Sequence, residues 1–291
     1  MISKELFKQI QNIHLHTKHL VNDVFAGEYE STFKGRGMEF EAVREYQPGD
    51  EIRLIDWNGT ARMGHPFVKV YHEERELTVM LIVDVSSSGK FGSLNKLKNE
   101  VSAEIAAILA FSAIHNNDKV GLIIFSEKVE KFIPPKKGSN HVWLVIKEVL
   151  SHKALHKGTN ISEALEFLYR VQSKRAVCFL ISDFLNTGFE KTFKIVSKKH
   201  DVIPISIIDP RERELPKVGI IELEDAENSE VIYINTNNEN IRNGIKRAWD
   251  KRFKEREDFF KLSGVDHIAI HTEKSYVEPI LKFFKMREKK L

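Results

Sequence analysis

The stretch ELTVMLIVDVSSSG, residues 76–89, decides the fold of this protein. Its apolar run over residues 79–83 has no polar interruption, which is typical of a strand buried on both faces of a parallel sheet. The run ends in a carboxylate, Asp84, and in the three serines 86–88. The stretch therefore predicts a central strand whose carboxyl end presents a group of small oxygen-bearing side chains.

Apolar, β-rich runs alternate with longer helical patterns from residue 77 onward. This alternation is typical of parallel strands joined by crossover helices, so it predicts an α/β fold with a doubly wound, mostly parallel central sheet flanked by helices. The strand at 128–136 contains Pro134 and Pro135 and is expected at an edge, because proline cannot donate to a sheet ladder. The remaining strands are expected at 76–85, 119–127, 175–183, 201–209 and 265–272, the helices at 94–115, 141–152, 161–172, 188–200, 238–264 and 275–290, and a hairpin between about 211 and 235.

Residues 1–76 lack this alternation. The first 20 residues place apolar side chains at helical spacing and predict an amphipathic helix. An extended segment rich in charge, glycine and aromatic residues follows, which we expect to pack with the helix on the α/β domain. The sequence thus divides into an N-terminal region, 1–76, and an α/β domain, 77–291.

Composition restricts the class of protein. The 45 Lys and Arg against 42 Asp and Glu give a formal net charge of +3, too balanced to predict nucleic-acid binding without a local basic face. No segment reaches about 18 unbroken apolar residues, so no membrane span is expected. The single cysteine, Cys178, lies in an apolar run and excludes a disulfide framework. These features predict a soluble, cytoplasmic protein with no nucleic-acid partner.

Five oxygen-bearing residues at predicted element ends point to a metal site. Asp84, Ser86 and Ser88 follow the central strand, at the sheet edge where open α/β folds bind ligands. Thr159 lies in the loop KGTN, and Asp183 ends a later strand. Hydroxyl and carboxylate oxygens suit a hard divalent cation such as Mg²⁺, or Mn²⁺ or Ca²⁺ in its place. Each of these residues alone is equally an ordinary turn or helix-cap residue, and only their joint placement favours a metal.

The D-x-S-x-S pattern that begins at Asp84, with a threonine at 159 and an aspartate at 183, resembles the metal-ion-dependent adhesion site of von Willebrand factor A domains. In that family a carboxylate of a protein partner completes the coordination of the metal. The resemblance implies that Ser86, Ser88 and Thr159 bind the metal directly, and that Asp84 and Asp183 act directly or through water. Neutral hydroxyl ligands leave a cation under-neutralised, which is the physical reason it would attract an acidic side chain.

One position departs from that pattern. Phe184 follows Asp183 where many relatives have a glycine. The shape of the rim of the site therefore does not follow from the resemblance.

The stretch at 33–76 contains a second recognisable pattern, formed by Gly35, Gly37, Glu39, Phe40, Arg44, Tyr46, Pro48, Gly49, Asp50, Arg53, Ile55, Asp56, Trp57, Ala61 and Arg62. This pattern resembles the bacterial and archaeal domain of unknown function 58. Members are commonly encoded beside MoxR-type AAA+ ATPases, so the resemblance implies an adaptor that works with such an ATPase in protein complex assembly or metal insertion.

The charged residues of this stretch favour a structural role. The three arginines at 44, 53 and 62, with carboxylates at 39, 45, 50 and 56, predict a partly buried ion network that locks the N-terminal segment onto the α/β domain. Direct contact of an arginine with a partner's carboxylate is the alternative. Pro48, Gly49 and Asp50 predict a tight turn, and Trp57 is expected to pack rather than to recognise a ligand.

An enzyme is the second hypothesis. Phosphoryl-transfer folds also place an aspartate at the end of a first parallel strand, beside Mg²⁺, so Asp84 would be the nucleophile of a Mg²⁺-dependent phosphohydrolase. Those of the haloacid-dehalogenase type resemble D-x-D, whereas this chain has Ser86 at the second position. The sequence therefore favours a non-enzymatic, Mg²⁺-dependent protein-binding module.

Overall fold

The computed structural model describes residue 29 and residues 38–73, 77–93, 96–224 and 230–289. These residues form two compact units. The smaller unit spans Phe33–Leu77, and the larger takes in the rest of the chain. The amphipathic helix predicted for the first 20 residues, and the family positions Gly35 and Gly37, lie outside the described residues.

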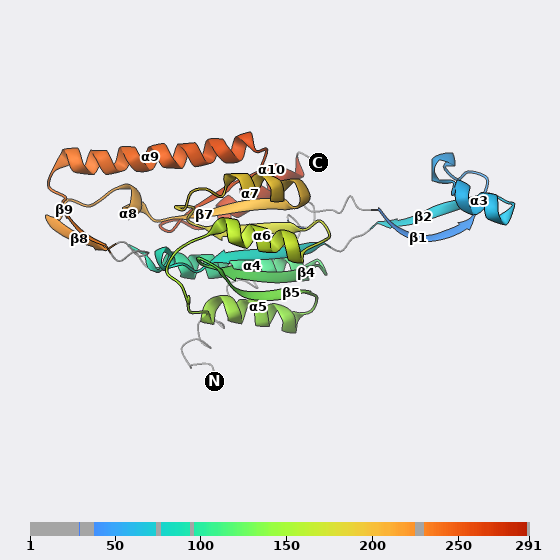
Figure 1. Ribbon diagram of the computed structural model, residues 1–291, viewed down its shortest axis with the longest axis horizontal. Coiled ribbons are helices and arrows are strands. Elements are labelled where there is room, and N and C mark those ends of the chain that lie inside the picture. Colours follow the sequence, from blue (N-terminus) through green and yellow to red (C-terminus); the bar gives the residue numbers. More distant parts are fainter. Residues whose placement is uncertain (1–28, 30–37, 74–76, 94–95, 225–229, 290–291) are drawn as a thin grey trace. The chain divides into compact units, whose positions relative to one another are not determined.

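The larger unit is built on one six-stranded sheet (Figure 1). Its strands are β3 (Thr78–Asp84), β4 (Lys119–Phe125), β5 (Val129–Lys136), β6 (Val177–Ser182), β7 (Asp201–Ile208) and β10 (Ile268–His271). They lie in the order β10-β7-β6-β3-β4-β5. Neighbouring strands are parallel except β4 and β5, which are antiparallel. The predicted α/β fold with a mostly parallel sheet is confirmed, and the proline-containing strand lies at an edge as expected.

One face of the sheet is covered by α6 (Ile161–Val171), α7 (Glu190–Lys199) and the end of α9 (Glu239–Leu262). These helices share a core with Met80 and with Cys178, which is fully buried as a small apolar side chain. Aromatic rings join the helices to one another and to the segment after β6. This core therefore supports one side of the predicted site.

The opposite face of the sheet is covered by α4 (Lys98–His115), which contacts β3, β4, β6 and β7 and packs against α5 (Ser139–Ser151). α4 begins at Lys98, four residues later than predicted, because the Glu100 carboxylate accepts a 2.9 Å hydrogen bond from the Leu97 N–H and caps the helix there. The last helix, α10 (Val277–Glu288), follows β10. Among the described residues, no helix combines the length and the apolar character needed to cross a membrane.

β3 lies at the point where the strand order reverses. The chain passes from β3 to β4 on one side, and later returns to β6 on the other side. Ligands of open α/β sheets bind outside the carboxyl ends of the strands at such a switch point. The sheet therefore brings the end of β3 and the end of β6 together at the predicted site.

A short lobe follows β7. The four-residue helix α8 (Pro210–Arg213), which the sequence did not predict, begins with a proline and is capped by the Asp209 carboxylate, which accepts a 2.9 Å hydrogen bond from the Arg211 N–H. The predicted hairpin is confirmed as β8 (Ile220–Glu224) paired antiparallel with β9 (Val231–Asn235).

The smaller unit is a β-hairpin, β1 (Met38–Glu45) paired antiparallel with β2 (Phe67–Glu73). Its connection holds a 3-10 turn, η2 (Ile52–Leu54), and the helix α3 (Trp57–Met63). The predicted tight turn at 47–50 is present, with Gly49 at φ +111° and a 3.0 Å hydrogen bond from the Asp50 N–H to the Gln47 carbonyl. The sequence did not predict this hairpin.

Candidate functional site

The residues predicted to bind a metal lie at the carboxyl edge of the sheet. Asp84 ends β3, Ser86 directly precedes the 3-10 turn η3 (Ser87–Lys90), and Ser88 lies within it. Asp183 follows directly after β6. Asp84, Ser86, Thr159 and Asp183 are all buried, with at most 8% of each residue exposed. The fold therefore places these side chains where the sequence predicted them, at one edge and largely shielded from water.

Asp84 is held by the backbone and by a neighbouring strand. Its carboxylate accepts a 2.9 Å hydrogen bond from the Ser86 N–H and a 2.6 Å hydrogen bond from the Ser182 hydroxyl. Burial, with a contribution from the nearby Asp183 carboxylate, raises the pKa of Asp84 to about 6. One oxygen of Asp84 thus orients the turn that carries the serines, and the other joins Asp84 to β6.

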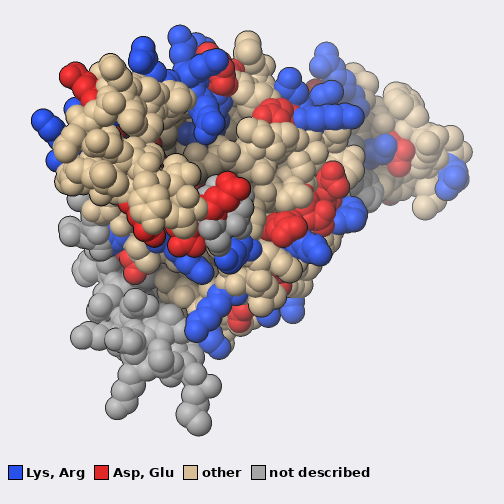
Figure 2. All heavy atoms as spheres, turned by 60° about the vertical axis from the view of Figure 1, so that its left-hand side comes forward, with Lys and Arg blue, Asp and Glu red and all other residues tan. Residues whose placement is uncertain are grey.

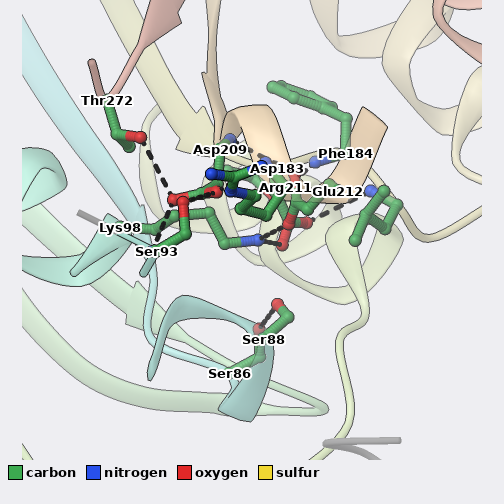
Figure 3. Close-up of polar contacts among 12 residues, drawn as sticks. Ser86, Ser88, Ser93, Lys98, Asp183, Phe184, Asp209, Arg211, Glu212 and Thr272 are labelled. Atoms are coloured by element: carbon green, nitrogen blue, oxygen red, sulfur yellow. Dashed lines mark hydrogen bonds and ion pairs between the residues drawn. The ribbon is translucent and has the colours of Figure 1, made fainter. Parts of the chain in front are cut away.

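The two serines of the pattern point toward each other (Figure 3). The Ser86 and Ser88 hydroxyl oxygens lie 3.0 Å apart. The nearby Ser88 hydroxyl adds to the larger effect of the Lys98 ammonium in lowering the pKa of the Asp183 carboxyl. Hydrogen bonds thus join Asp84, Ser86 and Ser88, and Asp183 is connected to this group electrostatically.

Thr159 lies in the loop between α5 and α6, next to the serine turn and to the segment after β6. Its carbonyl accepts a 2.8 Å hydrogen bond from the side-chain amide of Asn186. Two residues earlier, the Lys157 carbonyl accepts a 3.1 Å hydrogen bond from the Ser87 N–H. These bonds fix the threonine loop against both of the other segments of the site.

Lys98 is the residue that the sequence analysis missed. It is only 2% exposed, and its ammonium donates to the Asp183 carboxylate at 2.7 Å and to the Glu212 carboxylate of α8 (Figure 3). Burial alone would raise the pKa of Asp183, but the Lys98 ammonium outweighs it and the pKa is lowered. Burial would also lower the pKa of Lys98, yet the two carboxylates raise it. The result is a buried ammonium between two carboxylates, at the edge of the serine pair.

A second cation faces the same loop. The Arg256 guanidinium, from α9, donates to the Asp183 carbonyl at 2.7 Å and to the Phe184 carbonyl at 3.3 Å. The immediate surroundings of the site thus contain three carboxylates, those of residues 84, 183 and 212, against the cations Lys98 and Arg256. Their charges nearly cancel without any bound ion.

The surroundings of Phe184 show how a bulky residue is accommodated where a glycine was expected. Its φ is +54°, in the left-handed region that glycine adopts readily and a bulky residue adopts at a cost of about 1–2 kcal/mol. The ring is 4% exposed and lies 5.8 Å from the Phe189 ring and 5.4 Å from the Phe260 ring. Packing in the aromatic core therefore offsets the cost of a backbone conformation that glycine would adopt more readily.

Asp209 is a buried carboxylate that joins the loop before α4 to the ends of β7 and β10. Asp209, at the end of β7, accepts a 2.5 Å hydrogen bond from the Ser93 hydroxyl, a 2.9 Å bond from the Ser93 N–H and a 3.2 Å bond from the Thr272 hydroxyl. These donors lower the pKa of Asp209 against the effect of burial. The loop before α4, which positions Lys98, is thereby anchored to β7 and β10.

The charged residues of the smaller unit do not form the predicted network. Arg44 makes a bidentate ion pair with Asp50, with both distances 2.7 Å, but its side chain is 46% exposed. Arg53 and Arg62 have no ion pair with any residue that the structure describes. Within the described residues of the smaller unit the prediction of a partly buried arginine network is wrong, because this unit has too little interior to bury one.

The prediction that Trp57 packs is also wrong. Trp57 is 66% exposed at the start of α3. A seven-residue helix at the end of a two-stranded hairpin offers no second layer against which an indole ring could be buried.

On the face drawn in Figure 2, lysine and arginine side chains alternate with aspartate and glutamate over the larger unit and do not gather into one basic field.

The family model described as "Protein of unknown function DUF58" matches residues 42–255. The chain belongs to this family. The DUF58 match takes in part of the smaller unit and most of the larger one, including all five predicted metal-site residues.

This DUF58 protein is similar to one relative over nearly its whole length and to another over a shorter stretch. It is 27% identical over 288 residues to the uncharacterized protein Rv1480 of Mycobacterium tuberculosis, which covers 98% of this chain and 90% of that protein. It is 31% identical over 114 residues to the uncharacterized protein YeaD of Bacillus subtilis, which covers 39% of this chain and 25% of YeaD. Among solved structures, an aerotolerance-related membrane protein from Bacteroides fragilis aligns with a TM-score of 0.50 and 18% identity, over 74% of this chain and 100% of that chain. This structural likeness shows the fold alone.

Proposed function

We propose that this DUF58 protein is a non-enzymatic, Mg²⁺-dependent protein-binding module, whose metal is held at the edge of β3 and completed by a carboxylate of a protein partner. The observation that carries the proposal is the connected group of Asp84, Ser86, Ser88 and Asp183 at the switch point of the sheet. The three loops that carry the five oxygen-bearing residues adjoin one another at this edge, which supports a site of the von Willebrand factor A type.

The serine pair fits a small, hard cation. Mg²⁺ prefers octahedral oxygen coordination at about 2.1 Å, so two neighbouring ligands lie roughly 3.0 Å apart. The Ser86 and Ser88 oxygens are separated by 3.0 Å. Asp183 already receives hydrogen bonds from the Lys98 ammonium and the Leu185 N–H, which favours contact with the metal through water rather than direct ligation. When bound, the ion would supply an open coordination position for an acidic ligand.

The charge balance of the site favours recognition of an acid. The three carboxylates near the serines are largely matched by Lys98 and Arg256, so an added divalent cation leaves the site with excess positive charge. A carboxylate from a partner would neutralise that excess in a mostly buried environment, where charge interactions are stronger than in water. Because Lys98 and Arg256 already balance most of the carboxylate charge of the chain, the metal-bound site is most stable when a partner's carboxylate is bound as well.

A MoxR-type AAA+ ATPase is the partner that we propose, in an adaptor role in protein complex assembly or metal insertion. This part rests on the family resemblance of the stretch at 33–76. It is tested separately, by co-purification of the ATPase encoded beside the gene with and without chelator.

The test of the metal site is Mg²⁺ titration by calorimetry on single variants. Ser86→Ala and Ser88→Ala each remove one proposed ligand and should weaken Mg²⁺ binding at least tenfold. Ser87→Ala is the matched control, because its N–H and not its side chain is used in the turn, and it should bind Mg²⁺ like the wild type. Equal affinity of all three variants would reject the site. The double variant Ser86→Ala, Asp183→Ala should lose Mg²⁺-dependent capture of the partner with an unchanged far-UV circular dichroism spectrum.

The phosphohydrolase alternative is not favoured. Asp84 would have to attack as a nucleophile, yet one of its oxygens accepts a hydrogen bond from the serine turn and the other accepts one from Ser182 of the adjacent strand β6. A nucleophile needs a free oxygen aimed at the substrate. We expect no Mg²⁺-dependent turnover of generic phosphate esters, and robust turnover that Asp84→Asn abolishes would establish the enzyme instead.

A further inference from the structure

The hairpin of β8 and β9, in the larger unit, has two faces that its register defines. Directly paired residues of an antiparallel ladder share a face, and successive residues along a strand alternate between the faces. One face carries only aliphatic side chains, those of the pairs Ile221–Ile234 and Leu223–Ile232. We call the other face the acidic face. It carries the exposed pairs Ile220–Asn235, Glu222–Tyr233 and Glu224–Val231.

The base of the hairpin is held by Thr236, which is fully buried. The Thr236 N–H donates to the Gly219 carbonyl at 2.7 Å, and the Thr236 hydroxyl donates to the same oxygen at 2.6 Å. Arg242, from α9, donates to the Thr236 carbonyl. A hydrogen-bonded base therefore attaches the hairpin to α9, while its strands, orange at the left of Figure 1, extend beyond the six-stranded sheet.

The hairpin is an incomplete sheet. Among the described residues, β8 and β9 pair with each other and with no other strand. A two-stranded sheet is at best marginally stable in water, and a third strand or packing on its apolar face stabilises it. Large apolar side chains are nevertheless exposed on both faces: Tyr233 is 72% exposed, Ile220 71% and Ile232 54%. The outer edge of a strand in such a sheet is a template with which an extended segment can pair.

Charge selects β8 as the binding edge and a basic segment as its occupant. Residues 218–241 contain six Asp and Glu and no Lys, Arg or His, whereas the whole chain has a formal net charge of +3. Glu222 and Glu224 lie on β8 and make no ion pair with any residue that the structure describes. The residues of β9 on the same face carry no charge. A segment that pairs with β8 is therefore expected to be basic.

We propose that β8 binds an extended segment of a protein partner as the third strand of this hairpin, and that the segment carries Lys or Arg on both sides of an apolar residue. Residues of the added strand opposite Glu222 and Glu224 would point to the acidic face. The residue between them, opposite Leu223, would point to the aliphatic face. Addition of a strand to an exposed sheet edge is a common mode of peptide recognition.

The same charge argues against the other classes of macromolecule. An acidic edge repels the phosphates of nucleic acids and the headgroups of anionic lipids. The contact is separate from the metal site, whose expected ligand is an acid, and does not depend on the function proposed above.

Photo-crosslinking in the cells that naturally produce the full chain identifies the segment. Tyr233, on the acidic face, is replaced by p-benzoylphenylalanine, which keeps an aromatic ring at this position. Tyr169, exposed on α6, is replaced in the same way as the matched control. Crosslinked peptides are identified by mass spectrometry. The expected product at position 233, absent at position 169, is a segment of another protein with two basic residues that flank an apolar one.

That segment is then synthesised, and its binding to the full chain is measured by fluorescence anisotropy. The double variant Glu222→Lys, Glu224→Lys should weaken binding at least tenfold. The matched control is Glu255→Lys, Glu257→Lys, which changes the net charge equally at exposed positions of α9 and should bind like the wild type. Chelator should have no effect on the wild type.

Modified peptides test the strand pairing on the unaltered protein. A strand at a sheet edge donates hydrogen bonds to its neighbour from every second N–H only. One peptide therefore carries N-methyl groups at its odd positions and another carries them at its even positions. One of the two should lose at least tenfold in affinity, and the other should bind like the unmodified peptide.

Several outcomes would overturn the proposal. These are the absence of a crosslink above the control, crosslinks to nucleic acid, to lipid or to another copy or part of this chain, and a segment without the two basic residues. Unchanged binding by the Glu222 and Glu224 double variant, equal binding of both N-methylated peptides, or loss of binding in chelator would overturn it as well.

Discussion

Lys98→Met tests the electrostatics of the site most directly. Methionine keeps the length and much of the volume of lysine but removes the ammonium that donates to Asp183 and Glu212. The substitution leaves two carboxylates close together at a position where the lysine side chain was 2% exposed and that of Asp183 5%. The expected effect is therefore that of uncompensated buried charge rather than that of a lost surface ion pair.

The magnitude follows from this burial. Removing one partner of a buried ion pair costs about 3–5 kcal/mol. In a domain of this size each kcal/mol shifts the thermal midpoint by roughly 2–4 °C, so Lys98→Met should lower it by about 6–20 °C. Lys96→Met is the matched control: its ammonium lies 2.6 Å from Glu104, but its side chain is 46% exposed, and loss of such a pair costs only about 0.2–1 kcal/mol.

The assay is thermal unfolding followed by circular dichroism at neutral pH, run once in excess chelator and once in saturating Mg²⁺, because a ligand that binds only the folded state raises the midpoint. Mg²⁺ should raise the midpoint of Lys98→Met more than that of the wild type, because a divalent cation supplies the positive charge that the variant lacks. A loss in Lys98→Met no larger than that in Lys96→Met would refute the reasoning about buried charge. A full loss that Mg²⁺ does not reduce would instead count against the metal site.

Two further predictions concern the core. Phe260→Ala should lower the free energy of unfolding in urea by about 3–5 kcal/mol, because the ring is fully buried, whereas Leu262→Ala, at 86% exposure, should change it by less than about 0.5 kcal/mol; similar losses would contradict the assigned packing. Burial, with a contribution from Arg256, lowers the pKa of His267 to about 3, so the folded state stays neutral at this position while the unfolded state takes up a proton below pH 6.5. Stability is thus lost as pH falls through the window from 6.5 toward 3, and between pH 6.5 and 5 the wild type should lose about 2 kcal/mol more than His267→Gln. Equal pH slopes in urea unfolding would show that His267 is not buried in its neutral form.

Much of the larger unit could be predicted because its signals are local. The uninterrupted apolar runs of β3, β4, β6 and β7 reflect burial on both faces of the sheet, and the two prolines of β5 mark an edge. The carboxyl ends of parallel strands necessarily meet at one edge, so Asp84 and Asp183 could be placed together from strand assignment alone.

Lys98 could not be found in the same way, because its role depends on two acidic partners from distant loops. A signal was present: Lys98 shares a helix face with the buried Val101, Ser102 and Ile105, so a lysine occupies a position of the apolar stripe. Such a lysine must either extend to water or pair inside, and the sequence does not say which.

The sequence of the smaller unit also contains a pattern that indicates its hairpin, but this pattern lies among many charged residues. The segment MEFEAVRE of β1 alternates between apolar and polar side chains over its first five residues, as half-exposed strands do. The density of charged and glycine residues favoured an irregular segment packed on a larger core. The expectation that Trp57 packs fails for the same reason, since a buried indole needs a core that a two-stranded unit does not have.

The buried cations bear on what a metal at this edge would do. A structural metal site typically lacks an internal counter-charge, so its ligands repel one another without the ion and folding depends on loading. Here Lys98 pairs with both Asp183 and Glu212, and the Ser182 hydroxyl and the Ser86 N–H donate to Asp84, so each of these carboxylates has a partner within the chain itself. The divalent cation of the proposed function would therefore bind beside a buried ammonium and be held more weakly than in an all-acidic cage. An ion held in this way gains most from a ligand that brings its own negative charge, which is the behaviour expected of a recognition site that engages its metal and its partner together.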